Sequence, residues 1–370
     1  MAASTARSSS DANPHAAPQA DVGSDAGTPP TLAVDLLVIG AGPAGLFAAF
    51  TAGFRGLSVA VMDSLPELGG QVAALYPEKP ILDIAGLPAV PGRELIAVLT
   101  AQAMTAHPHL LLGHTAQTLS HGGDGLPTVT SDRGVGVRAG AVVITGGIGA
   151  FSPRPLAGGA AFLGRGLSYF VTDLADLDDQ DVLVVGGGDS AFDWALAAAD
   201  RARSVTLAHR RDTFRAHAAS VRAVQKSPAV RLRTSSRVAA LHGDGRGRLA
   251  AVELHDPHGA ERLPVTRLVA ALGFTASLGP LQDWGLKLND RHIVVDSRMA
   301  TSLPRVYAAG DITDYPGKVR LISVGFGEAA TAVNNAATDL DPAADLFPGH
   351  STEQSAEQSA EQRAEQEPSP

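Results

Sequence analysis

The sequence contains no cysteine in its 370 residues. A chain without thiols forms no disulfide, holds no cysteine-ligated cluster and carries out no thiol-based redox step. The apolar runs are also far shorter than the roughly 20 residues that a membrane-spanning helix needs. The N-terminus shows no basic segment followed by an apolar one, as a secretory signal would. We therefore expect a cytoplasmic protein that does not insert into membranes.

Basic residues are in the minority, with 29 Lys and Arg against 38 Asp and Glu and a net charge of −9. Residues 1–31 and 351–370 contribute −2 and −4 of this charge, which leaves −3 for residues 32–350. This balance argues against a nucleic-acid-binding protein. The first tail has almost nothing to bury and the second repeats EQSA and EQRA. We predict disordered tails over 1–31 and 353–370.

An apolar run followed by closely spaced glycines stands near the N-terminus, VDLLVIGAGPAG at 34–45. Strand, glycine turn and helix in this order are typical of a dinucleotide-binding fold. Gly40 permits the tight turn, Gly42 lets the backbone approach a pyrophosphate, and Gly45 lets helix and strand pack closely. The N–H groups at the start of the helix attract phosphate. The next strand, 57–62, ends in Asp63, at a distance where an acid accepts hydrogen bonds from a ribose.

The same pattern returns 146 residues later. The strand DVLVV at 181–185 precedes the turn Gly186-Gly187-Gly188-Asp189-Ser190-Ala191 and a helix to about Ala199. The following strand, 204–208, ends in His209-Arg210-Arg211 instead of an acid, with Arg215 and His217 just beyond. Arginine in this place binds the 2′-phosphate of NADP through charge-assisted hydrogen bonds. A solvated basic face is the alternative interpretation.

Further segments have the patterns of helices and strands. We expect a helix at 94–105, an antiparallel excursion of strands at 110–119, 128–130 and 134–137, and a strand at 141–144 that ends beside the first turn. Strands at 231–237 and 249–254 suggest a small meander. A strand at 305–309 would point Asp311 at the first site, with a helix at 328–337 behind it. A plain turn-forming role for Asp311 is the alternative.

The two turns and YAAGD at 307–311 resemble the two-dinucleotide-binding-domain flavoproteins, and thioredoxin reductase most. Thioredoxin reductases need a Cys-x-x-Cys before the second turn, where residues 169–177 hold no thiol. The chain is more similar to the thioredoxin-reductase-like class of ferredoxin–NADP reductases, and the match covers about 32–352. It is carried by GGQVAALYPEKPILDIAG (69–86), GGGDSAFDWAL (186–196), HRRDTFRAH (209–217) and AVNNAATDLDPAADLFPGHST (332–352). One departure is Pro80, where members of the class often have tyrosine.

This resemblance implies an α/β fold of two Rossmann-like domains. An FAD-binding domain at 32–151 and 278–352 would hold an inserted NADPH-binding domain at 152–277. The FAD contacts that it implies are Gly40, Gly42, Ala44, Gly45, Asp63, Gln71, Tyr76, Ala116, Phe151, Asp311 and Thr352. The NADPH contacts are Gly186, Gly188, Asp189, Ser190, His209, Arg210, Arg211 and Arg215. His350 would lie over the flavin ring.

The implied activity is that of an FAD-dependent ferredoxin–NADP(+) reductase, which moves electrons between NADPH and ferredoxin or flavodoxin. The flavin carries the chemistry, so neither a catalytic acid–base residue nor a metal is required. The resemblance also implies a homodimer. Two alternatives stay open: an NADPH oxidase or diaphorase that gives electrons to oxygen or quinone, and a non-catalytic NADPH-sensing flavoprotein.

Overall fold

Strand β1 (Thr31–Ile39) lies at the centre of the larger sheet, with its residues Leu36, Leu37 and Val38 fully buried. It pairs in parallel with β2 (Val59–Asp63) on one side and β8 (Gly136–Ile144) on the other. A strand between two parallel neighbours is covered on both faces, which explains its apolar run. The computed structural model describes residues 31–350. The predictions for the tail residues 1–30 and 353–370 and for Thr352 lie outside the described residues.

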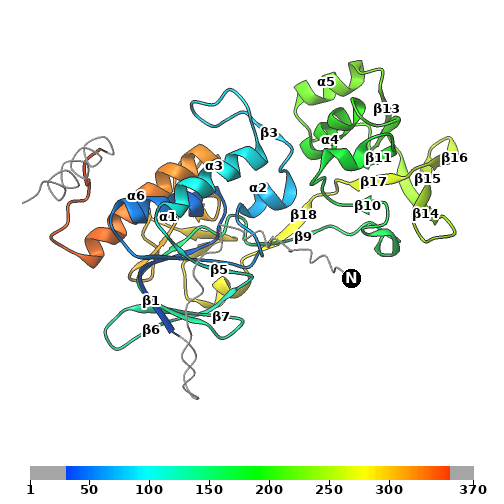
Figure 1. Ribbon diagram of the computed structural model, residues 1–370. Coiled ribbons are helices and arrows are strands. Elements are labelled where there is room, and N and C mark those ends of the chain that lie inside the picture. The colour runs from blue at the N-terminus through cyan, green and yellow to red at the C-terminus, as the bar shows by residue number, and fades with distance from the viewer. Residues whose placement is uncertain (1–30, 351–370) are drawn as a thin grey trace, which may run out of the picture.

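The larger sheet has seven strands in the order β5-β2-β1-β8-β7-β6, and β21 also pairs with β8. Its other strands are β5 (His109–Leu112), β6 (Ala116–His121), β7 (Pro127–Ser131) and β21 (Val306–Ala308). Three helices lie along one face of this sheet (Figure 1), namely α1 (Pro43–Phe54), α3 (Gly92–Met104) and α6 (Ile322–Leu340), and α1 packs against both of the others. The predicted strand–turn–helix order of the first motif is confirmed.

Two predictions for this lobe are wrong in detail. The segment 110–119 is not one strand, because it divides around Gly113, whose φ is +69°, into β5 and β6. β5 pairs in parallel with β2, so only β6, β7 and the start of β8 form the antiparallel excursion. The predicted strands 134–137 and 141–144 are one strand, β8. Its first half pairs with β7 and its last residues pair with β21.

The smaller sheet has five parallel strands in the order β10-β17-β11-β12-β13. They are β10 (Leu167–Ser168), β11 (Asp181–Val185), β12 (Ser204–Ala208), β13 (Val230–Arg233) and β17 (Arg267–Ala270). Helices α4 (Asp189–Ala199) and α5 (Ala218–Lys226) pack beside it. A meander of β14 (Arg237–Gly243), β15 (Leu249–Asp256) and β16 (Gly259–Pro264) completes this lobe.

The sequence misassigned the first strand of that meander. The residues 230–233 form β13, which pairs in parallel with β12 and belongs to the five-stranded sheet. The meander begins only at Arg237, after a turn in which Ser235 has a φ of +51°. Charged and apolar residues alternate in 230–233, and this pattern fits an edge strand of a sheet as well as a strand of an exposed meander.

The two lobes are joined by a two-stranded antiparallel ribbon, as Figure 1 shows. Its strands are β9 (Ala150–Pro153) and β18 (Phe274–Ser277), and Phe151 is opposite Ala276. The domain boundaries predicted at 151/152 and 277/278 fall within β9 and at the end of β18. Figure 1 also shows the loop around β3 (Pro80–Ile81) reaching toward the smaller lobe.

Shorter elements fill the connections: α2 (Gly70–Leu75), β4 (Val90–Pro91), β19 (Leu288–Asn289), β20 (His292–Val294), β22 (Thr313–Asp314) and the 3-10 helices η1 (Ala160–Phe162), η2 (Leu174–Leu177) and η3 (Gly279–Asp283). Of the helices within residues 31–350, none combines the length and the apolar character needed to cross a bilayer.

Candidate functional site

The first glycine turn is pressed against the end of β8. Gly40 has a φ of +108°, and a Cβ atom on it would lie 2.7 Å from the carbonyl oxygen of Thr145. A Cβ atom on Gly45 would lie 1.8 Å from the carbonyl oxygen of Gly40. Thr145 Oγ1 also donates a hydrogen bond of 2.8 Å to that oxygen. The protein itself therefore requires glycine at 40 and 45, as the motif predicts.

Gly42 differs from the other two glycines of the turn. The nearest atom to a Cβ built on it is Gly70 Cα, 4.0 Å away. Gly42 lines a cavity of about 370 Å³. It is also the N-cap of α1, where no side chain caps the first N–H groups. An open glycine beside free helix N–H groups is the arrangement that lets a phosphate approach the backbone.

Asp63 lies at the end of β2, buried to 8% exposure, and lines the same cavity. Its Oδ2 accepts a hydrogen bond from the N–H of Ala41 at 2.5 Å, and its Oδ1 accepts one from the N–H of Leu65 at 2.8 Å. Burial raises the pKa of Asp63, and these two N–H groups oppose the shift. The acid is thus fixed between the turn and the start of the next loop.

The cavity brings together nine residues that the sequence assigned to FAD. They are Gly40, Gly42, Ala44, Asp63, Gln71, Tyr76, Ala116, Phe151 and Asp311. Gly45 is buried beneath the turn, where it allows close packing. Pro80 is exposed on β3 and is not among the residues that line the cavity.

His350 is not brought to the cavity in this chain. Its ring is exposed and contacts the ring of Phe347 at 5.1 Å between centroids. The carbonyl oxygen of Leu346 accepts a hydrogen bond from Arg55 Nη1 at 3.4 Å. Arg55 follows the last residue of α1, whereas the glycine turn precedes the first. The segment leading to His350 therefore runs past the far end of the helix, and its contact with flavin stays a prediction.

Tyr76 joins the cavity to the interface between the lobes. It lines the cavity and packs against the hydrophobic cores of both lobes. Burial and the neighbouring carboxylates Asp311 and Asp83 raise the pKa of Tyr76 to about 12. The phenol therefore stays protonated at neutral pH and keeps an O–H group at the cavity wall.

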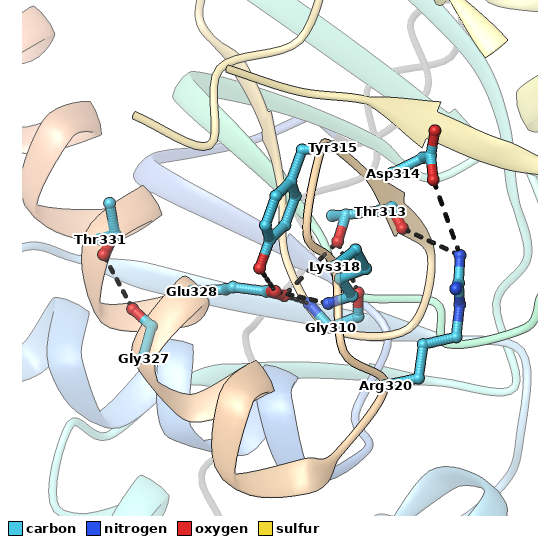
Figure 2. A network of polar contacts seen from close by, with 9 residues as sticks. All are labelled: Gly310, Thr313, Asp314, Tyr315, Lys318, Arg320, Gly327, Glu328 and Thr331. Atoms are coloured by element: carbon cyan, nitrogen blue, oxygen red, sulfur yellow. Dashed lines mark hydrogen bonds and ion pairs between the residues drawn. The ribbon is translucent and has the colours of Figure 1, made fainter. Parts of the chain in front are cut away.

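Asp311 follows β21 and lines the cavity, as the 305–309 pattern predicts. β21 pairs with β8, so Asp311 and Asp63, which ends β2, come from opposite sides of β1. Burial raises the pKa of Asp311, and the charges of Lys318 and Arg320 oppose this shift. The residue before it, Gly310, has a φ of +83° and is held by the side chains of Lys318 and Glu328. Figure 2 shows this polar network.

The second glycine turn is built like the first. A Cβ atom on Gly186 would lie 2.4 Å from the carbonyl oxygen of Ala271, which follows the last residue of β17, whereas a Cβ atom on Gly188 would have no atom within 4 Å. A Cβ atom on Gly187 would lie 2.2 Å from the ring of His209. The N–H of Arg215 donates to the carbonyl oxygen of Gly187 at 2.8 Å. The segment 209–217 is thereby folded onto the turn.

The residues predicted to contact NADPH divide into two groups. Ser190, Arg210, Arg211 and Arg215 are exposed beside the turn, and they are available to a ligand. Asp189 Oδ1 instead accepts a hydrogen bond from the N–H of His217 at 2.7 Å. Burial lowers the pKa of His209, whose ring packs on Phe214 with 5.6 Å between centroids. Asp189 and His209 therefore shape the loop that carries the arginines.

Sequence reasoning missed several residues of the first site. His114, Thr145 and Gly70 line the cavity, and Lys318 and Glu328 support Gly310 from behind. Gly70 has a φ of +54°, and a Cβ atom on it would lie 2.9 Å from Gly42 Cα. Glu328 could have been noticed in the sequence, because it is the one acidic residue among the small, buried residues of α6.

Comparison with known proteins agrees with this geometry. The family model described as pyridine nucleotide-disulphide oxidoreductase matches residues 34–336. A protein named ferredoxin–NADP reductase from Salinispora arenicola is 61% identical over 322 residues, which cover 87% of this chain and 99% of that protein. One of the same name from a Nocardioides species is 60% identical over 87% of this chain and 98% of its own length.

Among solved structures, the thioredoxin reductase of T. acidophilum superimposes with a TM-score of 0.70 and is 26% identical. The superposition covers 83% of this chain and 98% of that one. The two-lobed α/β architecture is therefore that of thioredoxin reductase, and the two sequence relatives each cover 87% of the chain.

Proposed function

We propose that this chain, which belongs to the pyridine nucleotide-disulphide oxidoreductase family and within it to the ferredoxin–NADP reductases, moves electrons between NADPH and a ferredoxin or flavodoxin. One observation carries the proposal. A thioredoxin-reductase-like fold with two nucleotide turns occurs here in a chain with no cysteine. Without a dithiol, electrons have to leave for an acceptor other than thioredoxin.

The residues of the first site fit an FAD group. The open position at Gly42 and the N–H groups at the start of α1 suit its pyrophosphate. The fixed carboxylate of Asp63 suits the ribose of its adenosine half, and Asp311 suits the polyhydroxyl chain of its flavin half. FAD and NADP(H) are the cofactors of the reaction. When bound, FAD supplies the conversion between two-electron hydride chemistry and one-electron transfer.

The protein's contribution is to bind, orient and exclude water. Gln71, Tyr76 and Phe151 wall the cavity near the ribbon that leads to the second lobe, where they would hold the flavin end. Arg210, Arg211 and Arg215 would hold the 2′-phosphate of NADPH on the segment that His209 and Asp189 shape. Gly186 lets the second turn pack against Ala271, and Gly188 leaves its backbone open to the pyrophosphate.

The proposal also includes a division into domains, an oligomeric state and a location in the cell. The predicted division into an FAD-binding domain and an inserted NADPH-binding domain agrees with the two lobes and their double connection. The resemblance to this class supports a homodimer. A cytoplasmic location is expected from the sequence.

The acceptor decides between this function and its alternatives. Cytochrome c reduction by NADPH should depend on added ferredoxin or flavodoxin, and thioredoxin should not be reduced. The rate should fall with salt to the extent that charge steers an acidic carrier, because screening acts over about 10 Å at 0.1 M ionic strength. Fast NADPH oxidation by oxygen or quinone that neither carrier increases would identify an oxidase instead. Flavin absorbance that NADPH fails to bleach would identify a sensor.

A further inference from the structure

A buried ion pair lies directly behind the cavity. The side chains of Lys318 and Glu328 are 2% and 5% exposed, and Nζ lies 2.5 Å from Oε1. Lys318 comes from the loop after β22, and Glu328 from the second turn of α6 (Figure 2). Neither residue is among those that line the cavity. Burying two charges is costly unless each is paired and hydrogen-bonded, so the pair needs a reason beyond filling space.

The contacts of the pair converge on the backbone of Gly310. Glu328 Oε2 accepts a hydrogen bond from the N–H of Gly310 at 2.7 Å. Lys318 Nζ donates to the carbonyl oxygen of the same residue at 3.0 Å. Thr313 Oγ1 donates to that oxygen at 2.8 Å. Figure 2 shows both backbone groups of Gly310 held in this way.

Gly310 needs this support because of its position. β21 ends at Ala308, so its ladder does not fix Gly310, and the φ of +83° is open mainly to glycine. Gly325 of α6 approaches closely, since its Cβ would lie 3.4 Å from Gly310 Cα. Asp311, the next residue, lines the cavity. Any rotation of the Gly310 backbone would move the Asp311 carboxylate.

The pair is completed by Tyr315, whose hydroxyl donates to Glu328 Oε1 at 2.5 Å. The ammonium of Lys318 also lies 5.5 Å from the centre of the Tyr315 ring. Glu328 thus accepts from a backbone N–H, an ammonium and a phenol. A fully satisfied polar network of this kind is rigid, whereas a partly satisfied one is not.

We propose that Lys318 and Glu328 are positioning residues for the flavin cofactor, because their buried ion pair fixes Gly310 and thereby holds Asp311 against the bound FAD. This inference rests on the proposed function. The pair acts through Gly310 and touches neither the cofactor nor NADPH. Its role is to keep the Asp311 carboxylate in one place while electrons pass.

The test measures FAD binding to the apoprotein, by flavin fluorescence, in Lys318→Met, Glu328→Gln and the double variant. Each single change should raise the Kd for FAD about tenfold to a hundredfold, because it leaves the remaining buried charge of the pair without its counter-charge. The double variant should bind FAD better than the product of the single effects, since no unpaired charge remains. The KM for NADPH, which binds in the other lobe, should not change.

Two further variants separate positioning from folding. Thr331→Ala removes a 2.9 Å hydrogen bond to Gly327 within the same helix, away from Gly310, and should leave the Kd for FAD unchanged (Figure 2). Tyr315→Phe removes one hydrogen bond from Glu328 but keeps the ion pair. It should raise the Kd by about twofold to tenfold. This milder variant tests the network even where a single charge removal prevents folding.

The inference is overturned if both single variants bind FAD within twofold of the wild type. It is also overturned if the losses multiply in the double variant and the NADPH KM rises in parallel, which would indicate general unfolding. A wild type that binds FAD but needs no ferredoxin or flavodoxin contradicts the proposed function instead. That result leaves the comparison of FAD affinities intact.

Discussion

The two glycine turns of this protein share one construction but differ in their surroundings. In both, the first glycine is pressed against a neighbouring strand end, with Cβ positions 2.7 Å from Thr145 O at Gly40 and 2.4 Å from Ala271 O at Gly186. In both, the middle glycine is open. The third position is glycine at 45 and alanine at 191. The turns alone therefore do not explain why two different nucleotides would bind.

The surroundings make the difference. At the first turn the acid predicted to bind the ribose, Asp63, is buried and bonded to the backbone, and the turn opens into a walled cavity. At the second turn the corresponding residues, Arg210 and Arg211, are exposed at the surface. An enclosed site suits a resident cofactor, and an open one suits a nucleotide that has to exchange in each catalytic cycle. We therefore expect the first turn to retain its nucleotide and the second turn to exchange its nucleotide.

The largest effects are expected when a side chain is placed at the open glycine of each turn separately. Gly42→Val should abolish FAD binding, because the side chain occupies the approach of the pyrophosphate. Gly188→Val should leave the protein yellow with full flavin but abolish reduction by NADPH. At both positions the new Cβ atom has no protein atom nearer than 4.0 Å among those beyond its chain neighbours, so this atom does not collide with the fold. Flavin content per chain and NADPH bleaching measure the two outcomes.

Each of these variants is the control for the other. Gly42→Val protein that purifies with full flavin would show that the first turn is not the FAD site. Loss of flavin in both variants would mean that the two lobes do not bind their nucleotides independently.

A smaller effect is expected from removing Arg210 and Arg211, which distinguish the second site from the first. Arg210→Ala with Arg211→Ala should raise the KM for NADPH about tenfold to a hundredfold, the value of hydrogen bonds to a charged group. NADH, which lacks the 2′-phosphate, should be used at nearly the same rate as before. Steady-state kinetics with both nucleotides measure the difference. Arg246→Ala, on the exposed turn between β14 and β15, is the control for a general loss of positive charge. Equal losses for both nucleotides would make the two arginines structural.

The sequence predicted the parts of each site that depend on local chemistry. Glycine spacing and the residue at the end of the next strand are local signals, so Gly40, Gly42, Asp63 and Arg210 could be placed from them. Asp311 lies 248 residues after Asp63, and both line the same cavity. It was predictable because a small-residue strand of a parallel sheet ends at the same edge as β1.

The remainder depends on contacts that leave no periodic pattern. Lys318 and Glu328 meet only because the loop after β22 folds over the start of α6. Residues 231–233 were assigned to the meander because an edge strand of a parallel sheet and an exposed hairpin strand show similar alternation. The hydrogen bond from the N–H of His217 to the carboxylate of Asp189 is a further contact of this kind, because it depends on how the loop folds.

The smallest expected effect concerns the link between the two sites. Lys79, on the loop beside Tyr76, forms an ion pair of 2.6 Å with Asp193 of α4, and its Nζ lies 5.6 Å from the centre of the Trp194 ring. The second glycine turn leads into α4, so this contact ties that turn to the loop beside the cavity of the first site. The Lys79 and Asp193 side chains are 20% and 36% exposed, and a pair of this kind contributes only about 0.2–1 kcal/mol.

Lys79→Met and Asp193→Asn should therefore each raise the KM for NADPH by no more than about fivefold and leave flavin content unchanged. The reason is that α4 and its turn lose one fixed contact with the larger lobe, while the residues that bind FAD are untouched. The exchanged pair, Lys79→Asp with Asp193→Lys, should recover part of the loss, because the attraction is restored across the same gap. If Lys79→Met combined with Asp193→Asn raises the KM for NADPH by the product of the two single increases, the lobes are not coupled through this pair. The walled first site and the open second site would then still be linked through the ribbon of β9 and β18 and the packing of Tyr76.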